Sequence, residues 1–315
     1  MIMKAAIIIN RNASQGRSLS KWNVISSNVI DMLPFEVSVH HTRSMQDVNE
    51  LVPMLLHDKK CNVFIGGGGD GTINYLLNQI IEQTGGDLSE LVLGGIGLGS
   101  SNDFHKPIEK ELKKIPLRLD FNNSVDHNIG QLEYTTESGS LNKTCFLLNS
   151  SLGLTASANQ FFNSPNRTLA FLKRSSSSLS IIYAALHTLF KYTPPRIAEK
   201  RFNGMKSARI NNMSIVKSPY LSGSFCYPEL VKAGDGKFGV YYCSEMNRWE
   251  VMGTMSGMMK QRFDDSAKRT KFTREEIELI TDDLLSIESD GEVFFGMDPR
   301  YSIFKSKISI AGHGY

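Results

Sequence analysis

The chain has 315 residues, of which 41% are hydrophobic and 21% charged, and its net charge at pH 7 is +3. This length is enough for one large or two medium-sized folded domains. The small net charge argues against a nucleic-acid-binding protein, and no apolar run is long enough to span a bilayer.

The first third of the chain alternates apolar, strand-like runs with amphipathic segments. Strands are predicted at 5–9, 35–39, 61–65 and 91–96, and helices at 22–32, 45–56 and 73–81. Strands separated by helices imply parallel crossover connections, so residues 1–127 are predicted to form an α/β domain with a doubly wound parallel sheet. Ligands bind beyond the carboxyl ends of such strands, where polar or glycine-rich loops are predicted at 10–16, 66–72 and 97–103.

From about residue 128 the pattern changes to short strand-like runs joined by turn signals. Such runs are predicted at 129–134, 144–148, 213–216 and 238–242, with one helical stretch at about 167–191. This pattern is typical of a second domain of antiparallel, sandwich-like sheets over residues 128–299. A last alternating run at 301–310 predicts that residues 300–315 return to the first domain. An exposed strand edge of the second domain would be a surface for a homodimer.

The most informative motif is Ile-Gly-Gly-Gly-Gly-Asp-Gly-Thr-Ile-Asn at 65–74, between a predicted strand and a predicted helix. A glycine loop lets backbone N–H groups approach an anion at the start of the helix. A carboxylate beside phosphates requires an intervening cation, so Asp70 predicts a Mg²⁺-nucleotide. The motif also satisfies the G-x-G-x-x-G pattern of dinucleotide-binding turns, and a tight turn without a ligand is a further alternative. No Gly-Lys-Ser/Thr follows, which excludes a Walker A loop.

Five motifs in a fixed order resemble the catalytic family of diacylglycerol kinases, which includes bacterial soluble lipid kinases and sphingosine kinases. They are Asn10-Arg11-Asn12-Ala13-Ser14-Gln15-Gly16, Gly68-Gly69-Asp70-Gly71-Thr72-Ile73-Asn74, Leu98-Gly99-Ser100-Ser101-Asn102-Asp103-Phe104, Gly234-Asp235-Gly236-Lys237-Phe238 and Asp290-Gly291-Glu292. The glycine motif is more distantly similar to those of NAD kinases and phosphofructokinases. The chain departs from the family pattern at Arg11, where proline is usual, at Ser100, where threonine is usual, and at His105-Lys106.

Phosphoryl transfer requires bound phosphates, neutralised charge and a base for the attacking hydroxyl. The backbone amides of residues 69–72 are expected to bind the phosphates of ATP. The resemblance implies a larger set of ATP contacts, namely Asn10, Arg11, Asn12, Ala13, Ser14, Thr42, Gly68, Gly69, Asp70, Gly71, Thr72, Ile73, Asn74 and Ser100.

Three aspartates are candidate ligands of an active-site Mg²⁺. Asp70 and Asp103 follow strands that are expected to be neighbours, and Asp126 matches a third carboxylate of the family near the domain junction. Together they predict an arrangement in which aspartates hold Mg²⁺ through water, because this ion prefers oxygen ligands and keeps several waters. Taken singly, each aspartate is more typical of a helix cap or a turn.

The resemblance also implies functional residues in the second domain. Glu292 is the implied general base and acts with the catalytic Asp70, although Asp-Gly before it is also an ordinary hairpin signal. Asp235 lies in a second Asp-Gly turn. There the resemblance implies a structural Mg²⁺, held by the Asp235 carboxylate and the backbone carbonyls of Lys232 and Lys237.

Two segments are candidates for contact with lipid. The stretch 172–192 has an apolar middle and basic ends, which suits either a membrane-facing helix or an ordinary core helix. The basic run 268–271, followed by Arg274, suits either anionic headgroups or a solvated face.

These observations predict a lipid kinase that uses ATP and Mg²⁺, with ATP in a cleft between the two domains. The expected reaction converts diacylglycerol, through its free hydroxyl, to phosphatidic acid. Alternatives are a sphingoid or other lipid acceptor, an NAD kinase-like enzyme, and a regulator that binds nucleotide or lipid without catalysis. NAD kinase is disfavoured because Asn102-Asp103-Phe104 stands where an Asn-Glu signature is expected. Four separated cysteines and no signal-peptide pattern predict a cytoplasmic protein, bound peripherally to the membrane during turnover.

Overall fold

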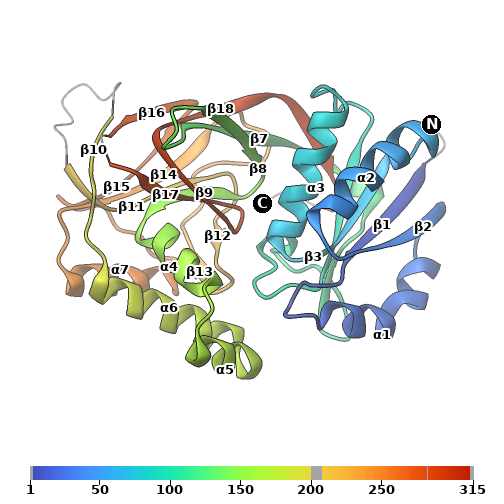
Figure 1. Cartoon of the computed structure of the whole chain (residues 1–315), viewed down its shortest axis with the longest axis horizontal. Helices are drawn as coiled ribbons and strands as arrows, with labels where there is room; N and C mark the ends of the chain where they lie inside the picture. The colour runs from blue at the N-terminus through green and yellow to red at the C-terminus, as the bar shows by residue number, and fades with distance from the viewer. Residues whose placement is uncertain (1–2, 200–207, 282, 313–315) are drawn as a thin grey trace. The chain divides into compact units, whose positions relative to one another are not determined.

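The computed structural model describes residues 3–199, 208–281 and 283–312. The chain forms two compact units (Figure 1). Unit 1 comprises the chain up to Ile129 and the C-terminal segment from Phe304, and unit 2 comprises Gly130–Ile303. The mixed α/β class is confirmed, with most elements being strands. Among the described helices, none combines the length and the apolar character that crossing a bilayer requires.

Unit 1 is built on a parallel sheet with the order β2-β1-β3-β4. Its strands are β1 (Lys4–Asn10), β2 (Glu36–Thr42), β3 (Val63–Gly68) and β4 (Val92–Gly97). The last residues of β18 (Glu292–Ile310) pair in parallel with β4. The hairpin of β5 (Lys110–Leu112) and β6 (Ile115–Arg118) joins β4 in antiparallel orientation.

The helices of unit 1 bury apolar stripes against this sheet. They are α1 (Ser18–Asp31), α2 (Met45–Pro53), which continues as a π-helical turn (Met54–Asp58), and α3 (Asp70–Gln83). Trp22 and Ile25 of α1 pack in one cluster with Ile7 and Ile65 of the sheet. Side chains alternate between the two faces of a strand, so α3, which packs against Gly66, covers the opposite face.

The glycine motif differs from the predicted loop. β3 continues through Gly68, and Gly69 alone separates it from α3, with an extended backbone at φ −101°. A Cβ on Gly66 would lie 2.5 Å from Cδ1 of Ile73, and one on Gly67 would lie 2.3 Å from Cδ1 of Ile9. The predicted loop at 66–72 is therefore wrong, because residues 66–68 belong to β3 and residues 70–72 begin α3. These glycines are needed for space, because α3 and the neighbouring strand pack where side chains would otherwise be.

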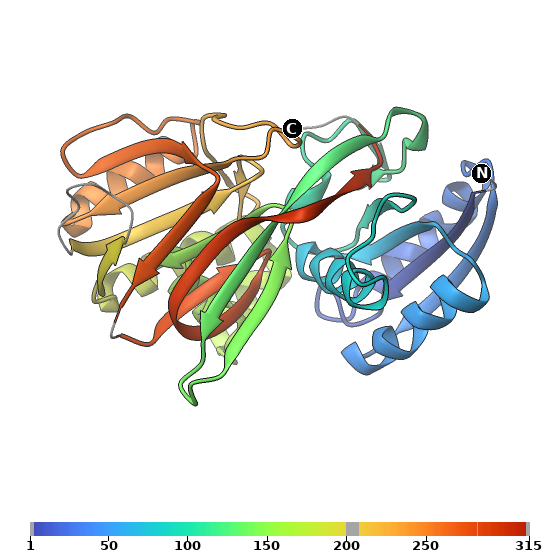
Figure 2. The same cartoon turned by 90° about the horizontal axis from the view of Figure 1, so that it is seen from above.

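Unit 2 is dominated by antiparallel strands. They are β8 (Leu141–Phe146), β9 (Asn149–Gly153), β10 (Arg196–Glu199), β11 (Ala208–Val216), β12 (Tyr220–Leu221), β13 (Phe225–Cys226), β14 (Phe238–Ser244), β15 (Arg269–Arg274), β16 (Glu276–Ile280) and β17 (Leu285–Ser289), with parts of β7 (Val125–Thr135) and β18. The hairpin of β7 and β8 is the green pair of strands in Figure 2.

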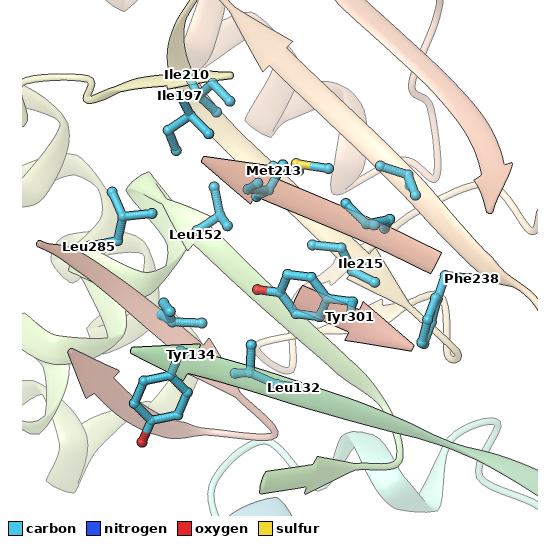
Figure 3. Packing of buried hydrophobic residues seen from close by; sticks show 14 of the residues in the cluster. Leu132, Tyr134, Leu152, Ile197, Ile210, Met213, Ile215, Phe238, Leu285 and Tyr301 are labelled. Atoms are coloured by element: carbon cyan, nitrogen blue, oxygen red, sulfur yellow. The ribbon is translucent and has the colours of Figure 1, made fainter. Parts of the chain in front are cut away.

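The strand pairing of unit 2 closes on itself. It passes from β11 to β9, β17, β18, β16 and β10, and β10 returns to β11. The expected sandwich of two sheets is thus corrected to a barrel-like sheet. Its interior holds a cluster of buried side chains from almost every strand, among them Leu152, Ile215, Phe238 and Tyr301 (Figure 3). Closure gives each of these six strands a partner on both sides, and sequence periodicity alone does not reveal it.

The described part of unit 2 also contains four helices, and the predicted stretch at 167–191 is two of them. The helices are α4 (Leu154–Asn163), α5 (Arg167–Ser175), α6 (Ser177–Lys191) and α7 (Arg248–Met258). The break falls at Ser176, whose hydroxyl accepts a hydrogen bond from the Leu179 amide and so caps α6. The prediction missed α7, which has two interior glycines but begins with a capping box of Asn247 and Glu250.

Candidate functional site

In unit 1, several predicted ATP contacts meet at the carboxyl ends of β1 and β3. Asn10 ends β1, and its Nδ2 donates to the Thr72 hydroxyl in the first turn of α3 at 3.0 Å. Thr42 pairs with Asn10 across β1 and β2, and its carbonyl accepts from the Arg11 amide at 2.9 Å. The segment 10–16 is thereby fixed to the start of α3.

Lys21 is a residue that the motif comparison missed. Its Nζ donates to the Ser14 hydroxyl and the Leu98 carbonyl, both at 3.3 Å, and to the Gly99 carbonyl at 3.4 Å. Burial, reinforced by the nearby charge of Arg17, lowers the pKa of Lys21. A cation therefore connects the loop after β1 with the loop after β4. Lys21 lies in the first turn of α1, just after the 10–16 motif, and this position is its one sequence signal.

The loops after β3 and β4 touch through two glycines. A Cβ on Gly99 would lie 2.3 Å from the Cα of Gly69, so this approach is possible only without side chains. Asn102 shapes the second loop. It adopts a left-handed backbone at φ 53°, and its Oδ1 accepts from the Gly99 amide at 3.0 Å. Asparagine tolerates this backbone conformation better than most residues.

Asp70 is the first residue of α3, which begins without a side-chain cap. One of its carboxylate oxygens accepts from the Phe104 amide at 2.9 Å, so Asp70 lies directly beside the motif that contains Asp103. The Thr72 amide already donates to the Gly69 carbonyl at 2.9 Å. The start of a helix favours anions, and the amides of Gly69, Asp70 and Gly71 are candidates to bind phosphate there.

The other predicted residues of unit 1 have different surroundings. Asp103 is buried, and Lys106 Nζ lies 2.7 Å from its carboxylate. Asp126 is exposed on β7 and accepts from the Ser309 hydroxyl at 2.9 Å. Ile73 and Asn74 are buried within α3, whereas Ser100 is exposed.

The described residues contain no group of three or more His, Cys, Asp or Glu side chains in position to hold a metal ion. The structure brings Asp70 and Asp103 together through the Phe104 amide. Both carboxylates already have partners in the protein, so a magnesium ion at this place would be held mainly through its waters.

In unit 2, Glu292 follows the turn between β17 and β18. Burial raises its pKa, which brings the carboxylate closer to the range of a general base. The preceding residue, Gly291, has φ 95°, and its carbonyl accepts from Asn159 Nδ2 at 3.0 Å. The turn that carries Glu292 is therefore fixed by side chains from other elements.

Asp290 provides the strongest of these restraints. Its side chain accepts from three consecutive backbone amides, those of Leu147 at 2.7 Å, Leu148 at 2.9 Å and Asn149 at 3.0 Å. These amides lie at the bend between β8, which ends at Phe146, and β9, which begins at Asn149. The predicted strand 144–148 runs across this bend. A carboxylate that accepts several backbone N–H bonds is a strong, charge-assisted acceptor. No sequence pattern indicates this role of Asp290.

Glu288 is a second buried carboxylate of the same turn that sequence reasoning missed. Its Oε1 accepts from the Gly291 amide and its Oε2 from the Ser151 hydroxyl, each at 2.7 Å. Glu288 thus restrains the turn from the strand side. It has no characteristic spacing from the motif residues, so only its contacts identify it.

The three residues that the resemblance assigned to a structural metal are close together in unit 2. The Asp235 carboxylate and the carbonyls of Lys232 and Lys237 all face the Nζ of Lys217. Burial raises the pKa of Asp235, but hydrogen bonds from Lys217 and from the amides of Lys232 and Lys237 outweigh this and lower it.

The helices α4 to α7 lie along one side of unit 2 (Figure 1). They expose large apolar side chains, including Phe171 at 69% and Trp249 at 77% of full exposure, together with Leu179 and Phe190. The basic run 268–271 is partly occupied within the protein. Lys268 pairs with Glu250 at 2.8 Å, and Lys271 Nζ donates to the Phe263 carbonyl at 2.9 Å.

Comparisons with known proteins agree with this geometry. Residues 4–131 match the model of the diacylglycerol kinase catalytic domain. A Staphylococcus carnosus (strain TM300) protein named "Putative lipid kinase" is 23% identical over 250 residues, which cover 79% of this chain and 76% of that protein.

Two solved structures from Bacillus anthracis str. Sterne share the fold. One, described as a "putative diacylglycerol kinase", has a TM-score of 0.70 and 17% identity. The other, described as a diacylglycerol kinase, has a TM-score of 0.65 and 14% identity. Both alignments cover 98% of this chain and 97% of the other chain. The resemblance indicated by the five motifs is therefore confirmed, and residues 4–131 carry the signature of the diacylglycerol kinase catalytic domain family.

Proposed function

We propose that the protein is a lipid kinase that transfers the γ-phosphoryl group of ATP to the free hydroxyl of a membrane lipid, with diacylglycerol as the first candidate acceptor. The observation that carries this proposal is the junction of three motif loops in unit 1. Lys21 and the paired glycines Gly69 and Gly99 hold these loops together at the carboxyl ends of parallel strands. Ligands of parallel α/β sheets bind at such ends.

Within unit 1, which we infer to be a doubly wound nucleotide-binding domain, the phosphates would lie at the uncapped start of α3. The amides of Gly69, Asp70 and Gly71 would bind them, and Asn10 would position the Thr72 hydroxyl. Asp70 and Asp103 would hold magnesium through water. When bound, this ion supplies neutralisation of the phosphate charge.

Unit 2 would bind the lipid and supply the base. Glu292, on its fixed turn, would take the proton of the lipid hydroxyl as the phosphoryl group is transferred. Its raised pKa supports this role, because a carboxylate with an ordinary pKa is a weak base near neutral pH. The names of the similar proteins support a lipid acceptor and, among lipids, diacylglycerol.

The exposed apolar side chains of α5 to α7 support transient contact with a membrane. Phe171, Leu179, Phe190 and Trp249 are large side chains that gain free energy at the lipid interface. Arg167 and Lys191, at the ends of α5 and α6, are exposed and would face anionic headgroups. This surface would hold the enzyme peripherally on the membrane while the acceptor is taken up.

The test is transfer of radiolabelled phosphate from ATP, with Mg²⁺, to vesicles that contain diacylglycerol, sphingosine or neither, and in parallel to NAD. We expect labelled phosphatidic acid from the diacylglycerol vesicles, and loss of this product in Asp70→Asn. If NAD is the molecule that becomes labelled, the protein is an NAD kinase and the proposal is wrong. Tight ATP binding without transfer to any acceptor would replace it by a regulator.

A further inference from the structure

The turn before β14 contains a cation site that is already filled by a side chain of the chain itself. Lys217 follows β11, and its side chain is fully buried. Its Nζ lies 2.9 Å from the Lys232 carbonyl, 2.6 Å from the Lys237 carbonyl and 2.8 Å from Oδ1 of Asp235. A lysine ammonium has three N–H donors, and these three oxygens provide an acceptor for each.

The oxygens are fixed independently of Lys217. Oδ2 of Asp235 accepts from the Lys232 amide at 2.9 Å, and Oδ1 accepts from the Lys237 amide at 3.1 Å. The carboxylate is thus oriented by the backbone of the turn, and the two carbonyls belong to the same turn. The site is a rigid cage of oxygens into which Lys217 reaches from another element.

Carboxylate oxygens and backbone carbonyls are also among the oxygen ligands that Ca²⁺ or Mg²⁺ takes in proteins, together with water. We propose that the ammonium of Lys217 is the permanent cation of this turn, and that it replaces the divalent ion that the donor set would otherwise bind. A metal ion would need to lie within about 2.0–2.6 Å of the same oxygens. It cannot enter without displacing the buried ammonium, which would then repel it at close range.

The site has a structural connection to the turn of Glu292. The carbonyl of Leu148 accepts from the amides of Lys217, at 2.7 Å, and Ser218, at 2.9 Å, while the Leu148 amide donates to Asp290. Lys217 and Asp290 therefore both hydrogen-bond to the backbone of Leu148, and Asp290 in turn holds the turn before Glu292. A covalently attached cation keeps this connection intact whatever the metal supply.

The experiment measures thermal unfolding of the full chain without nucleotide, in EDTA and in excess MgCl₂ or CaCl₂. The wild-type protein is expected to melt at the same temperature in all three solutions. Lys217→Met removes the ammonium but keeps the aliphatic packing. Because it leaves the partly exposed carboxylate of Asp235 and two backbone carbonyls without their cation, it should lower the melting temperature by roughly 5 °C in EDTA. Divalent ions should recover part of this loss.

Two variants separate the possible causes. Lys232→Met removes an exposed lysine of the same turn without changing the cage, so it should behave like the wild type. Lys217→Met combined with Asp235→Asn removes both charges and should lose the recovery by divalent ions.

The proposal is overturned if the wild-type protein gains thermal stability from Mg²⁺ or Ca²⁺ and this gain disappears in Asp235→Asn. A gain that survives in Asp235→Asn arises elsewhere in the chain and leaves the proposal intact. If Lys217→Met does not fold, the wild-type and Asp235→Asn measurements still decide. None of these readouts depends on kinase activity, so the inference stands or falls separately from the proposed function.

Discussion

Asp290→Asn tests whether the buried carboxylate holds the turn of Glu292. Asparagine has nearly the same size, and it tolerates the left-handed backbone that Asp290 adopts at φ 45°. The carboxylate accepts from Leu147 at Oδ2 and from Leu148 and Asn149 at Oδ1. An amide has only one acceptor oxygen. Its best orientation keeps the two bonds at Oδ1 and turns its NH₂ group toward the Leu147 N–H.

The cost follows from these contacts. One hydrogen bond to a charged acceptor is lost, worth about 1.5–3 kcal/mol, and two buried donors then face each other, for about 1–3 kcal/mol more. The sum is about 2.5–6 kcal/mol. For a domain of the size of unit 2, each kcal/mol lowers the melting temperature by about 2–4 °C, so we expect a fall of roughly 10 °C.

Asp298→Asn is the matched control. Asp298 has almost the same backbone, at φ 48°, but it is exposed and accepts from a single amide, that of Thr281, at 3.0 Å. Its substitution should cost less than about 1 kcal/mol. The assay is thermal unfolding followed by circular dichroism. Equal shifts in the two variants would refute the reasoning that three buried bonds fix the turn.

Three further predictions concern activity. Glu292→Gln should remove the acidic limb of the kcat/KM pH profile. Because burial raises the pKa of Glu292 above the ordinary 4.5, this limb in the wild-type enzyme should lie above pH 4.5. A limb that is unchanged in the variant would exclude Glu292 as the base. The same shift means that ionising Glu292 reduces the stability of the fold as pH rises through its raised pKa. Gly99→Ala places a Cβ 2.3 Å from Gly69 and should move the two loops apart by about 1 Å, lowering kcat/KM for ATP roughly 100-fold; Gly253→Ala, with open space around its Cβ, should change nothing. Lys21→Met should raise the Kd for ATP roughly tenfold by calorimetry, whereas an unchanged Kd would make Lys21 a packing residue only.

Local sequence patterns were sufficient to locate the parallel strands and the helices of unit 1, but they missed the hairpin of β5 and β6. The apolar runs at 5–9 and 91–96 are strands, and the amphipathic segments at 22–32 and 45–56 are helical. These elements could be predicted because the spacing of apolar residues along the chain is a local signal. The pattern failed where neighbours in space decide. Gly66 to Gly68 belong to a strand because Ile73 and Ile9 occupy the space of their side chains. Likewise, the barrel-like closure of unit 2 depends on pairing between strands far apart in the sequence.

The order and spacing of the five sequence motifs were enough to predict the family and to propose which residues bind nucleotide. Only the tertiary structure decided what surrounds these residues. Lys21 and Lys217 carry no motif, yet one joins two glycine loops and the other fills a cage of oxygens. The physical reason is that a hydrogen bond or an ion pair depends on distances of about 3 Å between atoms. Residues separated by tens of positions reach such distances only when the sheet brings their strands together.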